Sequence, residues 1–291
     1  MSIVYLNNSY IPMAEAKISP MDRGFLFGDG IYEVIPSYNG QMVGFAPHID
    51  RMNNGLSAVG IELGRFYKEG WSHHQWKEVC DNLIEKNGSG NLALYLHVSR
   101  GADTKRFHAY PEDIEPTVFA FAFEIPPAPV PDKSKVVGYK VATHRDLRWE
   151  RCQIKSTALL GNVMHFQHGY EQGANETLLY NDRNQLTEAS ACNAYIVKDG
   201  VVLTPPADNQ ILAGITRHIL LDLLRKEGSI PVEERPVTMD EVFDADEVWV
   251  TSSSKEVVPV IEIDGQPVGD GNIGDVWLAA QTIYSAGKLN Y

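Results

Sequence analysis

Residues 214–217, Gly-Ile-Thr-Arg, combine a glycine, a hydroxyl side chain and the start of an amphipathic pattern. Leucine and isoleucine follow at helical spacing, at Ile219, Leu220, Leu223 and Leu224. The first amides of a helix have no intrahelical partner, so they can bind an anion, and Thr216 adds a hydroxyl donor. The same pattern is also typical of an ordinary helix start.

Two other segments offer ligands for a phosphate group. Ser252, Ser253 and Ser254 follow a short apolar run, and three hydroxyls at the end of a strand can donate to an anion. Arg51 lies on the polar side of a predicted helix, and its guanidinium can bind a phosphate through two nitrogens. A solvated loop and a surface ion pair are the simpler interpretations of these two features.

Lys155 and Glu188 are candidates for covalent and acid–base chemistry. Lys155 stands among small and apolar neighbours just before a predicted helix. A desolvated lysine can present a free amine for Schiff-base formation, although most lysines extend into solvent. Glu188, also among small residues, fits either a buried carboxylate with a cationic partner or an exposed turn.

Two pairs of residues at short spacing could act together. Arg106 and His108 are two residues apart, so in an extended segment they face the same side and can receive one carboxylate. His165 and His168 are three apart on a predicted helix, as metal ligands can be. No nearby Cys, Asp or Glu completes a zinc set, so we predict no metal site.

A proline-rich segment divides the chain. Four prolines lie between Pro126 and Pro131, where they prevent both a helix and a central strand. We therefore predict an N-terminal α/β domain at 1–125, a linker at 126–133 and a larger C-terminal α/β domain at 134–291.

Helices and hairpins mix in both halves. Before the linker we expect a hairpin over 31–45 that turns at Asn39-Gly40, because this dipeptide favours a two-residue turn. Further predicted elements of this half are a helix that begins at Pro47, a helix at 73–87, and strands at 91–98 and 117–124.

After the linker we expect a strand at 136–143 and a helix at 156–172, in which Leu159, Val163, Phe166 and Tyr170 recur at helical spacing. Further elements are hairpins at 199–200 and 264–265, a helix at 215–227, a strand at 247–251 and a helix at 273–286. The fold class is therefore α+β or mixed α/β. No glycine-rich dinucleotide fingerprint or Walker-type loop is present in the sequence.

Composition excludes several classes of function. The 291 residues are 44% hydrophobic and 22% charged, as expected for a globular chain. With 25 Lys and Arg against 38 Asp and Glu, the formal net charge is −13, which argues against a general nucleic-acid or membrane-surface binder. We see no secretory signal and no apolar run of bilayer length, and three scattered cysteines predict no disulfide framework. We therefore expect a cytoplasmic protein.

Six segments, in this order, resemble the motifs of the fold-type IV pyridoxal-phosphate enzymes. This family includes D-amino-acid transaminases, branched-chain aminotransferases and aminodeoxychorismate lyases. The resemblance extends from about residue 3 to residue 265 and rests on residues 22–33, 48–51, 154–156, 187–190, 214–217 and 250–253. It implies a two-domain architecture with pyridoxal 5′-phosphate in the interdomain cleft.

The resemblance also implies roles for individual residues. Lys155 would form the Schiff base with the cofactor, and Glu188 would face the pyridine nitrogen. Other contacts to the cofactor would come from Arg51, Leu212, Ile215, Thr216 and Ser253, and contacts to the substrate from Tyr32, Arg106, His108 and Ser254. In the family dimer the arginine–histidine pair reaches the neighbouring subunit's site, so a homodimer is implied.

Residues 32–34 and 106–108 resemble the D-amino-acid transaminase type, in which the arginine and histidine bind the substrate α-carboxylate. The implied reaction is transamination of D-amino acids such as D-alanine or D-glutamate, with a 2-oxo acid such as 2-oxoglutarate or pyruvate as acceptor. A branched-chain L-amino-acid aminotransferase and an aminodeoxychorismate lyase remain as alternatives. One departure from the family pattern is Ala191 and Cys192, where a more uniformly Gly/Ser stretch is usual.

Overall fold

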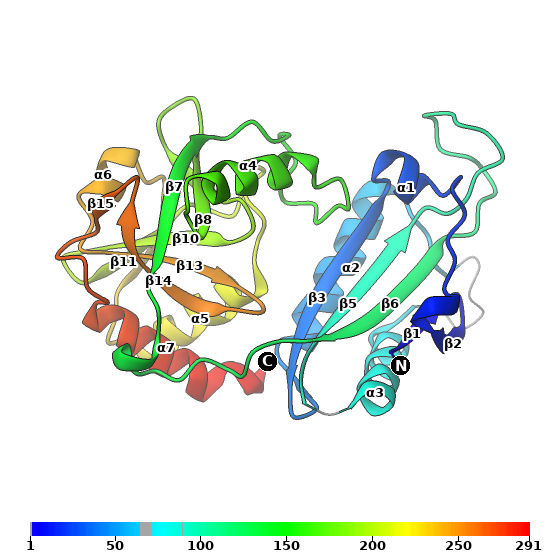
Figure 1. Ribbon diagram of the computed structural model, residues 1–291, viewed down its shortest axis with the longest axis horizontal. Helices are drawn as coiled ribbons and strands as arrows, with labels where there is room; N and C mark the ends of the chain where they lie inside the picture. Colours follow the sequence, from blue (N-terminus) through cyan, green and yellow to red (C-terminus); the bar gives the residue numbers. More distant parts are fainter. Residues whose placement is uncertain (1, 65–70, 89) are drawn as a thin grey trace. The chain divides into compact units, whose positions relative to one another are not determined.

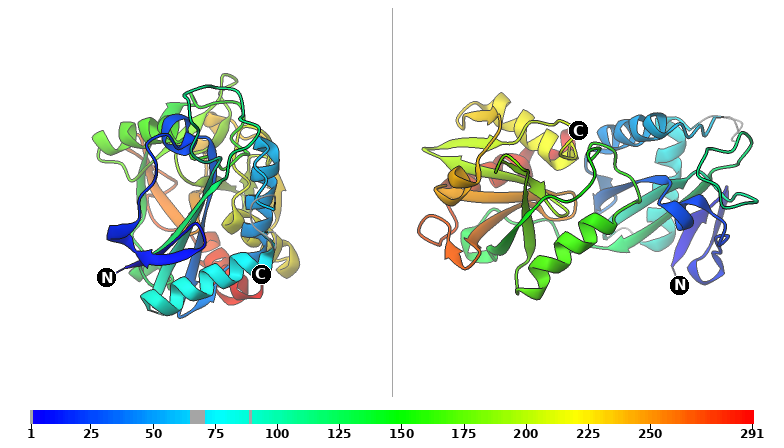
Figure 2. Two further views of the ribbon diagram at one scale, coloured as in Figure 1. Left: turned by 90° about the vertical axis from the view of Figure 1, so that its right-hand side faces the viewer. Right: turned by 90° about the horizontal axis from the view of Figure 1, so that it is seen from above.

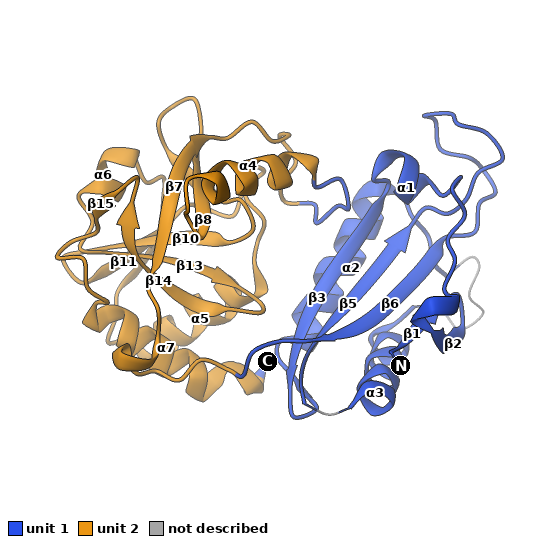
Figure 3. Ribbon diagram, in the orientation of Figure 1, with its two compact units in different colours: residues 1–127, 154–159, 291 blue, residues 128–153, 160–290 orange. Residues whose placement is uncertain are grey.

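The chain forms two compact units in a computed structural model that describes residues 2–64, 71–88 and 90–291. Unit 1 comprises residues 1–127, 154–159 and 291, and unit 2 comprises residues 128–153 and 160–290 (Figure 3). The predicted linker, 126–133, contains the point at which unit 1 ends and unit 2 begins. Residues 154–159 belong to unit 1, although they lie within the predicted C-terminal domain.

Unit 1 is built on a six-stranded sheet in the order β2-β1-β6-β5-β3-β4, in which every neighbouring pair is antiparallel (Figure 1). Its strands are β1 (Ile3–Leu6), β2 (Ser9–Pro12), β3 (Gly30–Tyr38), β4 (Gln41–Met42), β5 (Asn91–Ser99) and β6 (Thr117–Glu124). Its helices are η1 (Met13–Glu15), α1 (Arg23–Phe27), α2 (Phe45–Val59) and α3 (His73–Asn87).

Local sequence accounts for the ends of these elements. Asn39 and Gly40 both have positive φ, at 52° and 82°, and form the predicted turn between β3 and β4. Helix α3 begins after Ser72, which forms a capping box with Gln75, and ends before Gly88, as predicted. Helix α2 begins at Phe45, two residues before the predicted start at Pro47.

Helices α2 and α3 pack against the sheet of unit 1 (Figure 2). Because side chains alternate along a strand, Ile31, Glu33 and Ile35 of β3 share one face. The two isoleucines join the apolar core with Met52 of α2, and Glu33 is buried among them. Tyr32 therefore lies on the opposite face of the same strand.

The segment 154–157 adds a short extended stretch to the edge of β3 at its first residues, 30–32, which β4 does not reach. The N–H of Tyr32 donates to the carbonyl of Lys155 at 3.1 Å, and the N–H of Thr157 donates to the carbonyl of Gly30 at 2.9 Å. Ile31 and Ser156 form an antiparallel bridge. The helix predicted at 156–172 begins only at Leu160, and the first two of its predicted residues, Ser156 and Thr157, pair with β3 instead.

Unit 2 contains a nine-stranded mixed sheet in the order β12-β11-β10-β13-β14-β7-β8-β9, with β15 paired to β14. Its strands are β7 (Tyr139–Arg145), β8 (Glu176–Tyr180), β9 (Leu186–Ala189), β10 (Asn193–Lys198), β11 (Val201–Thr204), β12 (Val232–Glu234), β13 (Glu247–Ser252), β14 (Glu256–Ile263) and β15 (Gln266–Pro267). Its helices are η2 (Lys133–Lys135), α4 (Leu160–Glu171), α5 (Ile215–Glu227), α6 (Met239–Phe243), α7 (Asp275–Gly287) and η3 (Lys288–Asn290). The mixed α/β class is confirmed, and β7 begins three residues later than predicted.

Helix α4 does not bury the apolar residues that predicted it. Val163, Phe166 and Tyr170 are exposed, whereas His165 and Gly169 are buried against the sheet. Leu160 and Met164 add to this exposed apolar surface. In the part of the chain that the structure describes, no helix has the length and apolar character needed to cross a membrane.

We expect Gly28→Ala to destabilise the protein by about 2–4 kcal/mol. Gly28 has φ of +66°, and a Cβ there would lie 2.8 Å from the Cα of Ala158, so the variant combines backbone strain with a clash. Gly40→Ala is the matched control, because Gly40 has φ of +82° and open space around it. It should cost only about 1–2 kcal/mol. Urea unfolding of both variants measures the difference, and equal losses would contradict close packing of Gly28 on Ala158.

Candidate active site

Lys155 lies against Tyr32 in unit 1. Its Nζ is 4.2 Å from the centroid of the Tyr32 ring, a distance typical of a cation–π contact. The backbone pairing with β3 fixes both residues, because Tyr32 N–H donates to the carbonyl of Lys155 itself. Main-chain hydrogen bonds therefore hold Lys155, the predicted Schiff-base lysine, with its amine beside the aromatic ring of Tyr32.

Arg51 of α2 is half-buried and pairs with Glu33, whose carboxylate is fully buried, so this is not a surface ion pair. Its Nε and one terminal nitrogen donate to the two carboxylate oxygens of Glu33, each at 2.7 Å. His48 Nδ1 lies 2.7 Å from the same carboxylate. Burial alone would raise the pKa of Glu33, but Arg51 and His48 outweigh it and hold that pKa well below its usual range. Burial lowers the pKa of His48.

Arg106 and His108 lie together against one aromatic ring. The guanidinium carbon of Arg106 is 5.1 Å from the centroid of the Phe27 ring, and the ring of His108 is 5.2 Å from it. Phe107, between them, is exposed. Arg106 and His108, which the sequence predicts to bind a carboxylate, therefore both contact the ring of Phe27 in unit 1.

Glu188 of β9 is buried in unit 2, at 5% exposure, and accepts hydrogen bonds on both oxygens. Arg148 donates to one oxygen at 2.5 Å, while Asn193 Nδ2 and the N–H of Leu212 donate to the other, each at 3.1 Å. Burial raises the pKa of Glu188 to about 7, against the opposing effect of Arg148 and the Leu212 amide. Asp146 holds Arg148 in turn by accepting three hydrogen bonds, two from the guanidinium and one from the backbone N–H.

The start of α5 lies beside this carboxylate. Asn193 Nδ2 donates to the carbonyl of Leu212 at 2.7 Å, and a Cβ on Gly214 would lie 2.0 Å from Asn193 Oδ1. Gly214 is the N-cap residue and supplies no side chain to the first turn of α5, in which Thr216 is buried. No side chain caps the start of α5, so the first amides of this helix suit an anion. This helix start lies close to the buried carboxylate of Glu188.

The serine turn is at the same end of the sheet in unit 2. Asn193, the first residue of β10, pairs with Thr251 near the end of β13. Ser253 and Ser254 follow directly in the turn to β14 and are half-buried. Unit 2 therefore assembles Glu188, Leu212, Ile215, Thr216 and the two serines around the beginning of β10 and α5.

Several residues that organise these clusters were not singled out from the sequence. Glu33 and His48 lie within two of the six segments that resemble the family motifs, at 22–33 and 48–51, but the sequence did not indicate a role for them, and it did not point to Asp146, Arg148 or Asn193. Arg148 and Asp146 are separated from Glu188 by about forty positions, so no local pattern links them. Only the pairing of strands in unit 2 brings them together.

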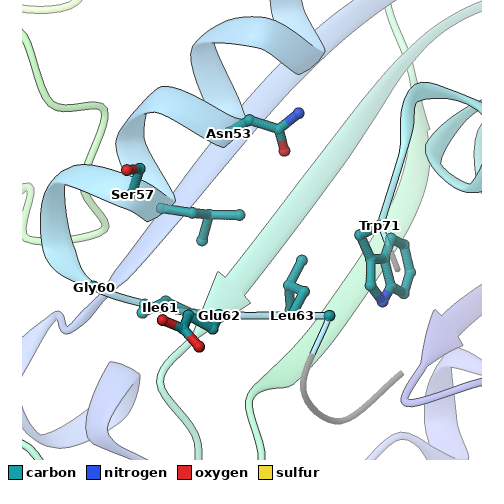
Figure 4. Close-up of a pocket in the computed structure, with 9 residues that line it drawn as sticks. Asn53, Ser57, Gly60, Ile61, Glu62, Leu63 and Trp71 are labelled. Carbon is teal, nitrogen blue, oxygen red and sulfur yellow. The ribbon is translucent and has the colours of Figure 1, made fainter. Parts of the chain in front are cut away.

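A hollow of about 290 Å³ lies elsewhere, at the C-terminal end of α2 (Figure 4). It is lined by residues that include Asn53, Glu62 and Trp71, and none of the predicted site residues lines it. Among the described residues, no group of three or more His, Cys, Asp or Glu is placed to hold a metal ion.

Comparison with known proteins identifies the relatives of this chain. A family model described as amino-transferase class IV matches residues 30–263. A D-alanine aminotransferase of Listeria monocytogenes serotype 1/2a (strain 10403S) is 38% identical over 275 residues, which cover 94% of this chain and 91% of that protein. A D-alanine aminotransferase of Staphylococcus aureus (strain COL) is 36% identical, with 95% and 94% covered.

Among solved structures, the branched-chain aminotransferase of Thermoproteus uzoniensis matches with a TM-score of 0.86 at 22% identity, over 99% of this chain and 95% of that chain. This likeness concerns the fold, which is fold-type IV.

We expect Glu188→Gln to change how stability depends on pH in the cofactor-free protein. Because the pKa of Glu188 is raised from 4.5 to about 7, the folded state retains a proton that the unfolded chain releases between these values. The contribution of Glu188 to the stability of the folded state is fully present below about pH 4.5 and is lost as the pH rises through 7. Relative to that of the wild type, the free energy of unfolding of the variant should rise by on the order of 2–3 kcal/mol between pH 4.5 and pH 8.

Urea midpoints at several pH values measure this difference. Glu176→Gln is the control, since Glu176 is a buried carboxylate of unit 2 that hydrogen-bonds Thr177 and Ser190 instead. A constant difference between Glu188→Gln and wild type across this range would contradict a raised pKa.

Proposed function

The chain belongs to the class IV aminotransferases, and on this basis we propose that it transfers the amino group of D-amino acids to a 2-oxo acid. Enzymes of this class use pyridoxal 5′-phosphate, which when bound supplies an aldehyde for a Schiff base and a ring that withdraws electrons from the substrate. D-Alanine and D-glutamate are the proposed donors, and 2-oxoglutarate or pyruvate is the proposed acceptor.

The residues present fit this cofactor. Glu188 is a buried carboxylate that suits a protonated ring nitrogen, and the uncapped start of α5 suits a phosphate. We assign the phosphate to the amides of Ile215 and Thr216, to Ser253 and to Arg51. Leu212 contributes through the backbone, since its N–H donates to Glu188.

Chemical roles follow from the donors and acceptors at each position. Lys155 supplies the amine that binds the cofactor and later moves a proton at the substrate Cα. Tyr32, whose ring contacts Lys155 Nζ, bounds the space beside that amine. The carboxylate of Glu188 favours a protonated ring nitrogen, and Arg148 and Asp146 keep that carboxylate in place.

The arginine–histidine pair supports D-amino-acid specificity. Arg106 and His108 are held side by side on Phe27, so they can receive one α-carboxylate together. Only one face of the substrate can then present its Cα–H to Lys155, and the position of the carboxylate decides which enantiomer reacts. We place Ser254 among the substrate contacts. The relatives named D-alanine aminotransferase support the same assignment.

A homodimer is part of the proposal. Leu160, Val163, Met164 and Tyr170 of α4 are between 59% and 74% exposed. Four large apolar side chains on one short helix form a patch that water solvates poorly and that a second copy would cover.

Transamination with both enantiomers of alanine, glutamate and leucine, with 2-oxoglutarate as acceptor, tests the function. We expect turnover with D-alanine and D-glutamate in the wild type. Arg106→Leu and His108→Ala should each lower kcat/KM for the D-donors, Arg106→Leu by roughly 30- to 1,000-fold, because a guanidinium–carboxylate pair is lost. Bound cofactor, measured by absorbance, should be largely retained.

Lys155→Ala is the inactive control for this series. A wild type that prefers L-leucine would establish the branched-chain alternative. Release of pyruvate from aminodeoxychorismate without an acceptor would establish the lyase. Native efficiency of both variants with D-donors would remove the proposed carboxylate site.

We expect Met164→Glu to weaken the dimer. Burying an unpaired carboxylate in an apolar interface is costly, so the dissociation constant should rise at least about tenfold. Light scattering after gel filtration measures the mass, which should be twice 32.4 kDa for the wild type. Thr282→Glu is the control, because it adds the same charge at an exposed position of α7. An unchanged mass for Met164→Glu, or a monomeric wild type, would contradict this interface.

A further inference from the structure

Helix α1, which has a single turn, contacts the loop that carries Arg106 and His108 through both backbone and side chains. The N–H of Arg23 donates to the carbonyl of Gly101 at 2.8 Å, and the N–H of Asp103 donates to the carbonyl of Met21 at 3.2 Å. Asp22 caps the helix by accepting from the N–H of Gly24 at 2.8 Å. The base of the loop is therefore fixed to the start of α1.

Arg23 binds the far part of the loop. Its guanidinium, at 3% exposure, donates to the carbonyls of three consecutive residues: Phe107 at 2.5 Å, His108 at 3.1 Å and Ala109 at 3.4 Å. Its Nε donates to Asp29 at 2.8 Å. A planar fork with five N–H groups can satisfy all of these acceptors at once, whereas a lysine ammonium cannot.

Phe27, one turn later on α1, supports the side chains of the same loop. Its ring lies 5.1 Å from the guanidinium carbon of Arg106 and 5.2 Å from the ring of His108. The guanidinium carbon of Arg23 is 5.0 Å from the same ring. Arg23 and Phe27 therefore hold the backbone and the side chains, respectively, of the arginine–histidine pair.

We propose that Arg23 and Phe27 are positioning residues for recognition of the substrate α-carboxylate. This inference rests on the proposed function, in which Arg106 and His108 bind that carboxylate. A loop that is already ordered does not lose further conformational entropy when the substrate binds, so its contribution to affinity is larger. Neither Arg23 nor Phe27 touches the reacting atoms in this proposal, and each acts through Arg106 and His108.

Steady-state kinetics of the holoenzyme with D-alanine and 2-oxoglutarate test the proposal. Arg23→Lys and Phe27→Leu should raise the KM of both substrates by at least about fivefold, because both carry an α-carboxylate, with kcat within about threefold of the wild type. The absorbance maximum of the bound cofactor should stay unchanged. A change that merely loosened the fold would lower kcat and cofactor content together.

Two matched variants serve as controls. Phe25→Leu alters a ring of the same helix that is 77% exposed, so its KM should match the wild type. Arg100→Lys alters a second buried arginine on Asp29, whose terminal nitrogens donate to the carbonyls of Val59 and Gly60. Its guanidinium carbon lies 3.5 Å from the centroid of the Tyr110 ring, so it contacts the loop beyond residues 107–109 and not at their carbonyls. Its effect on KM should be smaller than that of Arg23→Lys.

A double-variant cycle separates a positioning role from an independent one. If Arg23 acts through Arg106, then Arg23→Lys should raise KM by less than about twofold in an Arg106→Leu background. Equal effects in both backgrounds, or an unchanged KM in Arg23→Lys and Phe27→Leu, would overturn the proposal. If Arg23→Lys fails to fold, Phe27→Leu is tested in its place: it should raise KM in the wild-type background and by less than about twofold in the Arg106→Leu background. If Arg106→Leu alone leaves the KM of D-alanine unchanged, the assignment of Arg106 to the α-carboxylate has failed instead, and a wild type without turnover of D-donors would mean that the proposed function has failed.

Discussion

The pairing of residues 154–157 with the edge of β3 is the interaction on which the candidate site depends. It takes a segment flanked on both sides by unit 2 and makes it part of the sheet of unit 1. Main-chain hydrogen bonds, rather than side-chain contacts, thereby fix Lys155 beside Tyr32. Gly28 permits the close approach, because any side chain there would collide with Ala158.

Glu33 and Glu188 are both buried carboxylates with arginine partners, but the pKa of Glu33 is lowered and the pKa of Glu188 is raised. Glu33 receives two nitrogens of Arg51 and faces His48, and its pKa is low. Glu188 receives one nitrogen of an arginine that Asp146 also engages, and burial keeps its pKa near 7. Glu33 accepts two guanidinium hydrogen bonds and Glu188 accepts one, from an arginine that it shares with Asp146, and the charge of Asp146 raises the pKa of Glu188 further. Glu33 is thus a fixed anion that orients Arg51, whereas Glu188 can exchange a proton near neutral pH.

Local patterns predicted much of the fold. The bounds of α3 and α5 follow from residues at their ends, and the turn at Asn39-Gly40 follows from two residues that tolerate positive φ. The helix predicted at 156–172 was too long, because Ser156 pairs with Ile31 of β3, which lies more than a hundred residues earlier in the sequence. The apolar spacing of Val163, Phe166 and Tyr170 signals a helix but cannot tell a buried face from an exposed one. Most site residues could be nominated from motifs, whereas Arg148, Asp146 and Asn193 required the fold.

The division of unit 1 along the sequence has a consequence for the order of its synthesis. Once residues 1–127 have emerged from the ribosome, every strand of the six-stranded sheet has been made, yet residues 30–32 of β3 still lack their partner at 155–157. Residues 128–153, including β7, must be made before that partner emerges. During this interval the nascent chain presents unpaired N–H and C=O groups, the kind of edge that associates with other chains. The sheet of unit 1 can therefore be completed only after the first part of unit 2 has been made. A gene fragment that ends at the proline-rich segment encodes a sheet in which residues 30–32 of β3 lack this partner.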